Sequence, residues 1–370
     1  MSSHTIDVLI FLLVLGLRFG LPLAIPYFPL PAVLACLVLD GMDQSIFQKF
    51  TDLDLTNYQG YDKALDIYYL TIAYLSTLRN WTNNDAFNAS RFLLYYRLVG
   101  VLLFEFTHVR ALLVIFPNTF EYFFIFYEAV RLRWDPIRMG RRLVIGAVAA
   151  IWIVIKLPQE YWIHVAQLDF TDEMAERPNS WPILITLVAI LLIAAWWIVT
   201  RRLPPADRRP ELRVPDPFAD PAIRAAMTTL PPRRVFDSSL FEKVAMISLV
   251  SVIFSQILPD MEATGVQVAL GVTLLIFANT VVSEWLVRRG TGWTTMLQQF
   301  VAMAVVNTGL VVLSSLVLRR ADGSIHLGNT LFFLLLITLL VTLYDRFRPI
   351  YLARRAAVAG APVGATSAAQ

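Results

Sequence analysis

The chain has 370 residues, of which 57% are hydrophobic and only 16% are charged, and its net charge is +3. A soluble domain of this size carries about 25% charged residues, so the composition argues against an ordinary soluble fold. The only cysteine, Cys36, excludes an intrachain disulfide and a cysteine-based metal cluster. Most arginines stand in connecting segments that flank apolar blocks, as topogenic charges do, so we expect no nucleic-acid partner.

Long apolar blocks predict the fold class. Residues 181–200 contain no charge in twenty positions, which suffices to cross a hydrocarbon core of ~30 Å at ~1.5 Å per residue. Lipid cannot satisfy free backbone N–H and C=O groups, so such blocks must be helices. We therefore predict an all-α, polytopic helical membrane bundle with about ten (ten or eleven) transmembrane helices. The predicted spans are 6–25, 31–50, 61–78, 92–116, 143–163, 181–200, 243–258, 265–285, 294–318 and 330–344.

One aromatic segment, residues 119–134, is ambiguous because its two glutamates share one helical face. It either crosses the membrane, giving eleven spans, or lies along the interface as an amphipathic helix, giving ten. Arginine bias predicts a cytoplasmic C-terminus in the cell (plasma or inner) membrane. With ten spans the N-terminus is also cytoplasmic, and with eleven the first third of the chain is inverted.

The pattern also predicts five regions. An N-terminal helical half carries most of the intramembrane polar residues, and a further span follows it. An arginine- and proline-rich cytoplasmic linker leads to a four-helix membrane half and a disordered tail. These regions are 1–165, 166–200, 201–237, 238–348 and 349–370.

Four aspartates near the N-terminus form the most informative pattern. Asp40 and Asp43 are three residues apart on one predicted helix, and Asp62 and Asp66 are four apart on the next. Each pair therefore shares a face, and two antiparallel neighbouring helices can turn the pairs toward each other. Carboxylates at membrane depth repel one another unless they are protonated or bridged by cations, and their oxygens favour hard ions such as Mg²⁺ or Mn²⁺.

This aspartate spacing resembles a motif of the CDP-alcohol phosphotransferases. The motif reads Asp-x2-Asp-Gly-x2-Ala-Arg, then eight or nine residues, then Gly-x3-Asp-x3-Asp, and its aspartates hold divalent metal between the second and third spans. The likeness is confined to residues 40–66, where Gln44 and Tyr58 replace the two glycines and Phe47-Gln48 replaces Ala-Arg. The resemblance implies an enzyme that acts on a phosphorylated substrate with Mg²⁺ or Mn²⁺ bound by Asp40, Asp43, Asp62 and Asp66.

The same aspartates also have a purely structural interpretation. Asp40 and Asp43 would then form ion pairs with Arg18 or Lys63. The second pair would be favoured by the positive N-terminal end of its helix.

A second polar group lies in and after the predicted span at 92–116. Ionisable groups inside a span are costly and are therefore candidates for function. Arg97 and Arg110 are candidate anion partners, and Glu105 and His108, which share a face, are candidates for proton transfer. The alternative is a buried salt-bridge network between helices. The group consists of Arg91, Arg97, Glu105, His108, Arg110, Asn118, Glu121 and Glu128.

A third group, Lys156, Glu160 and His164, forms one stripe at the end of a predicted span. No metalloprotease, nucleotide-binding loop, serine hydrolase or dinucleotide motif occurs in the sequence.

The first functional hypothesis is a membrane-embedded, divalent-metal-dependent enzyme acting on a lipid or phosphorylated substrate. The four aspartates would be metal ligands, the two candidate anion partners would bind the substrate, and the catalytic candidates are Asp66, Glu105 and His108. The expected partners are the bilayer and an anionic lipid or lipid substrate. The alternatives are an ion- or proton-coupled transporter and a non-catalytic membrane scaffold that binds partners through its linker and basic tail.

Overall fold

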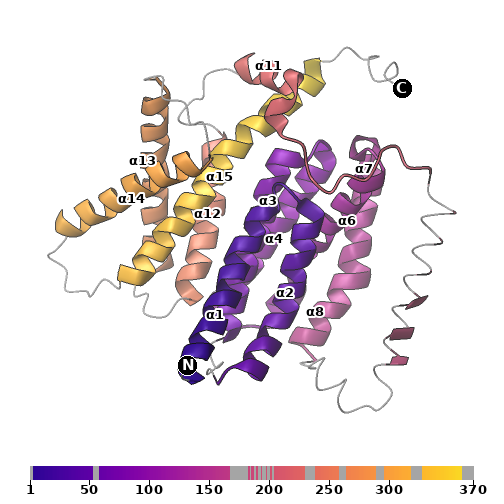
Figure 1. The fold of residues 1–370 in the computed structure, drawn as a ribbon, viewed down its shortest axis with the longest axis horizontal. Helices are drawn as coiled ribbons and strands as arrows, with labels where there is room; N and C mark the ends of the chain where they lie inside the picture. The colour runs from indigo at the N-terminus through magenta and orange to yellow at the C-terminus, as the bar shows by residue number, and fades with distance from the viewer. Residues whose placement is uncertain are drawn as a thin grey trace.

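A computed structural model describes residues 3–52, 58–166, 204–229, 238–257, 264–288, 296–317 and 327–360, with single positions between 182 and 201. Every regular element in these ranges is a helix, which confirms the predicted all-α class. The helices form two groups, α1 to α8 and α12 to α15. The long helix α15 belongs to the second group and slants along the boundary with the first (Figure 1).

The first group begins with four long helices, α1 to α4, and ends with the shorter helices α5 and α6 and the continuous α7–η3–α8 segment. Its elements are α1 (Ser3–Gly20), η1 (Leu21–Ala24), α2 (Pro29–Phe50), α3 (Tyr58–Asn80), α4 (Asn84–Thr107), α5 (Ala111–Ile115), α6 (Thr119–Arg133), η2 (Pro136–Arg138), α7 (Arg141–Ala150), η3 (Ile151–Lys156) and α8 (Leu157–His164). The remaining elements are η4 (Pro217–Ala219), α11 (Pro221–Thr229), α12 (Ser238–Ile257), α13 (Gly265–Arg288), α14 (Met296–Val317) and α15 (Leu327–Gly360).

Five helical segments in the described ranges are long and apolar enough to cross a membrane, which fits an integral membrane protein. The predicted count of about ten spans is therefore not supported. Residues 111–133, which include most of the ambiguous segment 119–134, qualify as one of the five by length and composition. The five are Thr5–Ala24, Pro29–Phe50, Ala111–Arg133, Arg141–Ile163 and Ser238–Ile257.

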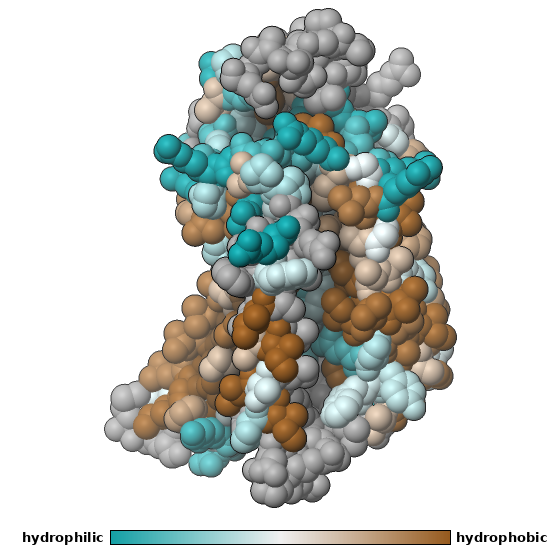
Figure 2. Space-filling model, turned by 90° about the vertical axis from the view of Figure 1, so that its right-hand side faces the viewer, coloured by the Kyte–Doolittle hydropathy of each residue, from teal (hydrophilic) through white to brown (hydrophobic). Residues whose placement is uncertain are grey.

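Large apolar side chains on these helices point outward. Leu13 and Val154 are 63% and 71% exposed, as expected of positions that face lipid. Figure 2 shows hydrophobic side chains over much of the lower part of one face, with hydrophilic ones gathered in a band above them. This banding is the pattern of an apolar belt bounded by a polar interface.

Helix α3 lies inside the first group and is buried along almost its whole length from Ala64 to Asn80. It carries many polar residues, but they have partners within the protein. The hydroxyl of Tyr68 donates to Phe19 O at 3.0 Å, and that of Tyr74 donates to Glu242 Oε1 at 2.6 Å. Because neighbouring helices satisfy these groups, α3 can occupy the interior without a strongly apolar sequence.

The predicted linker contains η4 and α11, and its extended part lies against the first group of helices. The Val214 N–H donates to Tyr27 O, and the Asp207 N–H donates to Arg133 O, both at 2.8 Å. The last helix, α15, continues through Pro349 to Gly360, so residues 349–360 of the predicted tail are helical and the rest lies outside the described residues.

Candidate functional site

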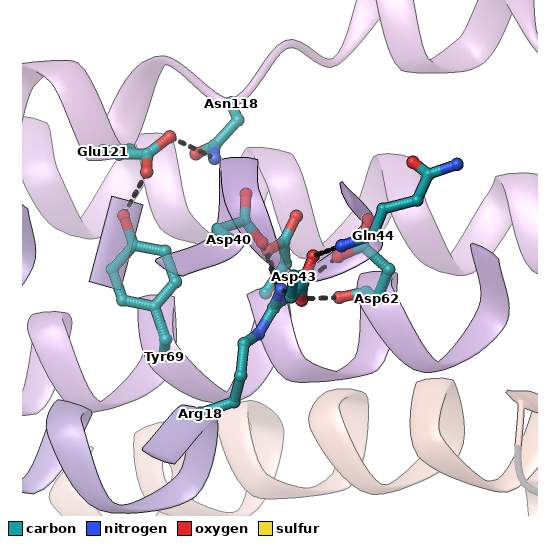
Figure 3. A network of polar contacts seen from close by, with 9 residues as sticks. Arg18, Asp40, Asp43, Gln44, Asp62, Tyr69, Asn118 and Glu121 are labelled. Atoms are coloured by element: carbon teal, nitrogen blue, oxygen red, sulfur yellow. Dashed lines mark hydrogen bonds and ion pairs between the residues drawn. The ribbon is translucent and has the colours of Figure 1, made fainter. Parts of the chain in front are cut away.

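The predicted aspartates meet around a single cation, Arg18 of α1. Its Nη2 lies 2.6 Å from Asp40 Oδ1 on α2, 3.1 Å from Asp62 Oδ1 and 3.4 Å from Asp66 Oδ1 on α3. Its Nη1 donates to Asp43. Figure 3 shows the guanidinium pointing from α1 into the carboxylates of the two neighbouring helices. The four predicted ligands therefore converge, and Arg18 forms the ion pairs that the structural interpretation proposed.

The structure divides the four aspartates into two kinds. Asp43 is buried behind Arg18, with only 2% of its side chain exposed. Asp40, Asp62 and Asp66 each present one oxygen within 4.8 Å of the others, an arrangement that can hold a metal ion. Asp40 Oδ1 is buried and accepts no hydrogen bond from the described residues, because its contact with Arg18 lacks hydrogen-bond geometry.

These three carboxylates line a cavity of about 400 Å³ enclosed by α2 to α6 and α8. The remaining polar lining is rich in cations and amides, so acidic and basic groups share one chamber. The lining residues are Leu37, Asp40, Gln44, Asp62, Lys63, Asp66, Ile67, Arg97, Val101, Phe104, Arg110, Leu113, Asn118, Glu121, Tyr122, Lys156, Gln159, Glu160 and Ile163.

A break in the chain between α5 and α6 positions one side of the cavity. Pro117 cannot continue the preceding helix, and α6 starts afresh at Thr119. The carbonyl freed at Phe116 accepts a hydrogen bond from Arg97 Nη1 at 3.0 Å. The break therefore orients Arg97, a predicted anion partner, and places Asn118 against the cavity.

Asn118 connects two glutamates that line the cavity. Its Nδ2 donates to Glu121 Oε2 at 3.0 Å, and its backbone N–H donates to Glu160 Oε1 at 3.1 Å. The other oxygen of Glu121 accepts a hydrogen bond from Tyr69 of α3 (Figure 3). Lys156 Nζ lies 3.8 Å from Glu160. The predicted third group thus joins the same cavity through Lys156 and Glu160, whereas the side chain of His164 lies outside the described residues.

The other two catalytic candidates, Glu105 and His108, do not line the cavity, whereas Asp66 does. Glu105 stands beside Lys63, with 3.8 Å between its Oε1 and the ammonium Nζ, so it orients a cation that lines the cavity. His108 is exposed in a left-handed conformation (φ 54°) at the end of α4 and is not among the lining residues. Arg110, two residues later, does line the cavity.

Two further members of the predicted second group, Glu128 and Arg91, lie away from this cavity. Glu128 is fully buried, and it accepts hydrogen bonds from Trp81 Nε1 at 2.8 Å and Arg131 Nε at 2.6 Å. Arg91 lines a separate cavity against α12 and α15. The heptad spacing of Glu121 and Glu128 indicated a shared face, but α6 meets different neighbours at its two ends.

The sequence interpretation named Arg18 as a partner of Asp40 and Asp43 but did not place it among all four aspartates, and it overlooked Tyr69. The signal for Arg18 was available, because it is the only basic residue in the mostly apolar segment 6–25. A lone cation in a span requires a partner, and apart from Asp7 at the start of the same segment, the next acidic residues along the chain are those of the following helices. Tyr69 carried no such signal, since tyrosines recur throughout α3.

No family model, characterised protein or solved structure matches this chain. The resemblance to the CDP-alcohol phosphotransferases therefore stays a prediction based on residues 40–66 alone.

Fully ionised, the aspartate cluster carries more negative charge than Arg18 alone compensates, so it is balanced either by protonation or by further cations. When all four carboxylates are ionised, Arg18 compensates one charge and three remain. Divalent metals bind carboxylate oxygens at about 2.0–2.6 Å, so ligand atoms on opposite sides of an ion lie roughly 4–5 Å apart. The three oxygens within 4.8 Å of one another fit this requirement.

Proposed function

We propose that this protein is a membrane-embedded enzyme that uses a divalent cation, Mg²⁺ or Mn²⁺, to act on a lipid or another phosphorylated substrate. One observation carries the proposal: a metal-competent group of three aspartates and four basic residues line the same cavity. Carboxylates recruit a hard cation, and arginine and lysine bind phosphate. A chamber that offers both sets suits a substrate whose phosphate is held between metal and protein cations.

Each group has a defined role in this proposal. Asp40, Asp62 and Asp66 hold the cation, which when bound supplies Lewis-acid stabilisation of charge on a phosphate oxygen. Asp43 binds Nη1 of Arg18, and Nη2 of the same guanidinium lies among the other three aspartates, so the four carboxylates remain close together without metal. The basic residues bind and orient the substrate phosphate; they are Lys63, Arg97, Arg110 and Lys156.

We further propose that the upper end of the molecule in Figure 1 faces the cytoplasm of a cell membrane. The end of α6 and the start of α7 lie there, and they carry Arg131, Arg133, Arg141 and Arg142. The arginine-rich end of α15 points the same way (Figure 1). By the positive-inside rule, these arginines support a cytoplasmic C-terminus.

Metal binding is tested by thermal unfolding of the detergent-purified protein with increasing Mg²⁺ or Mn²⁺. The wild type should be stabilised in a saturable way, and Asp40→Asn and Asp66→Asn should weaken the apparent metal affinity by about tenfold or more. Asp52→Asn is the matched control, because Asp52 is exposed beyond the end of α2. Equal stabilisation of the wild type and both aspartate variants would refute the metal site.

Transport is the second candidate, and one feature favours it. Residues Ile151–Lys156 form a π-helical segment inside the α7–α8 helix, and π-bulges occur mostly at functional sites. This segment ends at Lys156 in the cavity, so a local change of register would move a cavity cation. Ion- or proton-driven flux in proteoliposomes that is lost in Asp66→Asn, without metal-dependent stabilisation, would favour transport over catalysis.

A further inference from the structure

A second cavity, of about 570 Å³, opens between α4, α12 and α15. None of its lining residues lines the aspartate cavity. It contains two arginines, Arg91 and Arg348, and one acidic residue, Glu242. Its chemistry is therefore separate from the metal site proposed above.

Arg348 is a buried cation with unused donors. The residue is only 8% exposed, and its Nε and Nη1 donate to no acceptor among the described residues. Its Nη2 lies 3.3 Å from Glu242 Oε2. A guanidinium has five N–H groups in a planar fork that matches the oxygens of a phosphate. Arg348 therefore brings a positive charge with unpaired donors to the wall of the cavity, although Nε and Nη1 themselves are buried.

Glu242 does not compete strongly for a second cation, because its own oxygens are already engaged. Oε1 accepts a hydrogen bond from Tyr74 at 2.6 Å, and Oε2 accepts one from Tyr344 at 3.2 Å. Arg91 stands on the α4 side, held by Asn88 Oδ1 at 3.4 Å. Two guanidiniums and one carboxylate leave the cavity with a net positive charge.

The level of the cavity in the membrane indicates where the anion comes from. Ser238 lines it and is also the first residue of α12, a helix of membrane-spanning length and apolarity. The start of such a span lies at the boundary between hydrocarbon and headgroups. Phe92 and Phe241 line the same cavity and are 57% and 68% exposed, so they offer apolar surface at its mouth.

We infer that this cavity binds the phosphate of an anionic phospholipid from the surrounding bilayer. The guanidinium of Arg91 contacts the phosphate, Arg348 contributes its positive charge from the cavity wall, and the two exposed phenylalanines contact the beginning of the acyl chains. Bound lipid would then bridge α4 of the first helical group to α12 and α15 of the second.

The inference is tested on delipidated protein in a non-ionic detergent, by thermal unfolding and native mass spectrometry. The probes are phosphatidylglycerol, phosphatidylcholine and inorganic phosphate. Phosphatidylglycerol should stabilise the protein in a saturable way and give bound adducts. Phosphatidylcholine should bind more weakly because of its compensating positive charge. Inorganic phosphate should bind at least about tenfold more weakly than phosphatidylglycerol, since it lacks acyl chains.

Arg91→Gln and Arg348→Gln should each weaken phosphatidylglycerol binding by about tenfold. Arg142→Gln removes the same charge from an exposed position and should bind like the wild type. If Arg348→Gln does not fold, because Glu242 loses its ion pair, the lipid affinity of Arg91→Gln still tests the inference. Unchanged lipid affinity in Arg91→Gln, or equal binding of phosphate and phosphatidylglycerol, would overturn the inference. Asp40→Asn should keep lipid binding, which separates this site from the metal site.

Discussion

Arg18 and Asp43 form an ion pair in the interior of the first helical group, with 5% and 2% of their side chains exposed. Because the second nitrogen of the same guanidinium faces the other three aspartates, one arginine connects α1 to both α2 and α3. Removing a buried charge from its partner usually costs more than the pair itself contributes, because the remaining ion stays in a low-dielectric environment. The packing of these three helices therefore depends on the charge of Arg18.

Replacing Arg18 with glutamine should destabilise the protein by roughly 3–5 kcal/mol in the absence of divalent ions. The carboxylates would then lack their shared cation, and the variant should gain more stability from Mg²⁺ than the wild type does. Thermal unfolding in detergent with and without Mg²⁺ measures both effects.

The exposed Arg142 provides a control with the same charge loss, and Arg142→Gln should leave both values unchanged. A stable Arg18→Gln protein with no added response to Mg²⁺ would show that the carboxylates do not need a cation.

Lys63 connects the acidic and basic parts of the cavity, and Glu105 orients it across 3.8 Å. Lys63→Met preserves much of the side-chain volume and its contact with the Phe104 ring but removes the charge. We expect phosphate or a phosphorylated lipid to bind about tenfold more weakly to this variant, with Mg²⁺-dependent stabilisation retained. Isothermal titration with the anion measures the first effect.

Glu105→Gln should weaken anion binding less than Lys63→Met does, because it leaves the ammonium in place. An equal loss of metal response in Lys63→Met would mean instead that the substitution disturbs the whole cluster.

The two glutamates of α6 should respond differently to substitution. Glu128 is fully buried between Trp81 and Arg131 and lines no part of the aspartate cavity. Glu128→Leu leaves an indole N–H and a guanidinium without their acceptor, so we expect a loss of roughly 3–5 kcal/mol with unchanged metal affinity in the folded fraction. Circular dichroism melts and Mg²⁺ titration separate the two effects.

Glu121→Gln tests the opposite case, since Glu121 lines the cavity beside Asn118. It should alter ligand binding more than stability, because an amide keeps most of the local hydrogen bonds. The reverse pattern, with Glu128→Leu affecting ligand binding and Glu121→Gln affecting only stability, would contradict the assignment of these roles.

The helices of the first group could largely be predicted from sequence. The expected span at 31–50 corresponds to Pro29–Phe50, and that at 61–78 to Tyr58–Asn80, because prolines and polar turns bound both. The continuation of α15 to Gly360 differs from the disordered tail predicted at 349–370. Helix formation there is compatible with charge, because the arginines can reach polar partners: Arg354 donates to the carbonyl of Arg79 at 2.7 Å.

The site was predictable only in part, because periodicity says which residues share a face but not which helix that face meets. Asp40 and Asp43 on one helix, and Asp62 and Asp66 on the next, were spaced so that the two pairs could face each other. The structure shows this convergence. The spacing did not indicate that α6 and the η3–α8 segment would close the same chamber and add Glu121 and Lys156. Those contacts join positions far apart in the chain, and single-sequence patterns do not encode such pairings.

Gly100 of α4 permits the close approach that shapes the break before α6. A Cβ added at Gly100 would overlap the Phe116 side chain, with its Cγ at 2.5 Å. Phe116 cannot move freely, because its carbonyl holds Arg97 and Pro117 follows it. Gly100→Ala should therefore destabilise the protein by about 1–3 kcal/mol and weaken anion binding in the cavity by displacing Arg97.

Gly146→Ala is the matched control, because a Cβ added at Gly146 meets nothing within 4 Å. Alanine is also preferred to glycine inside a helix by about 0.5–1 kcal/mol, so this variant should be at least as stable as the wild type. Thermal unfolding and anion titration of the two variants, side by side, measure the difference. If Gly100→Ala behaves like Gly146→Ala, then Phe116 relaxes without cost and the tight contact between α4 and the break does not position Arg97.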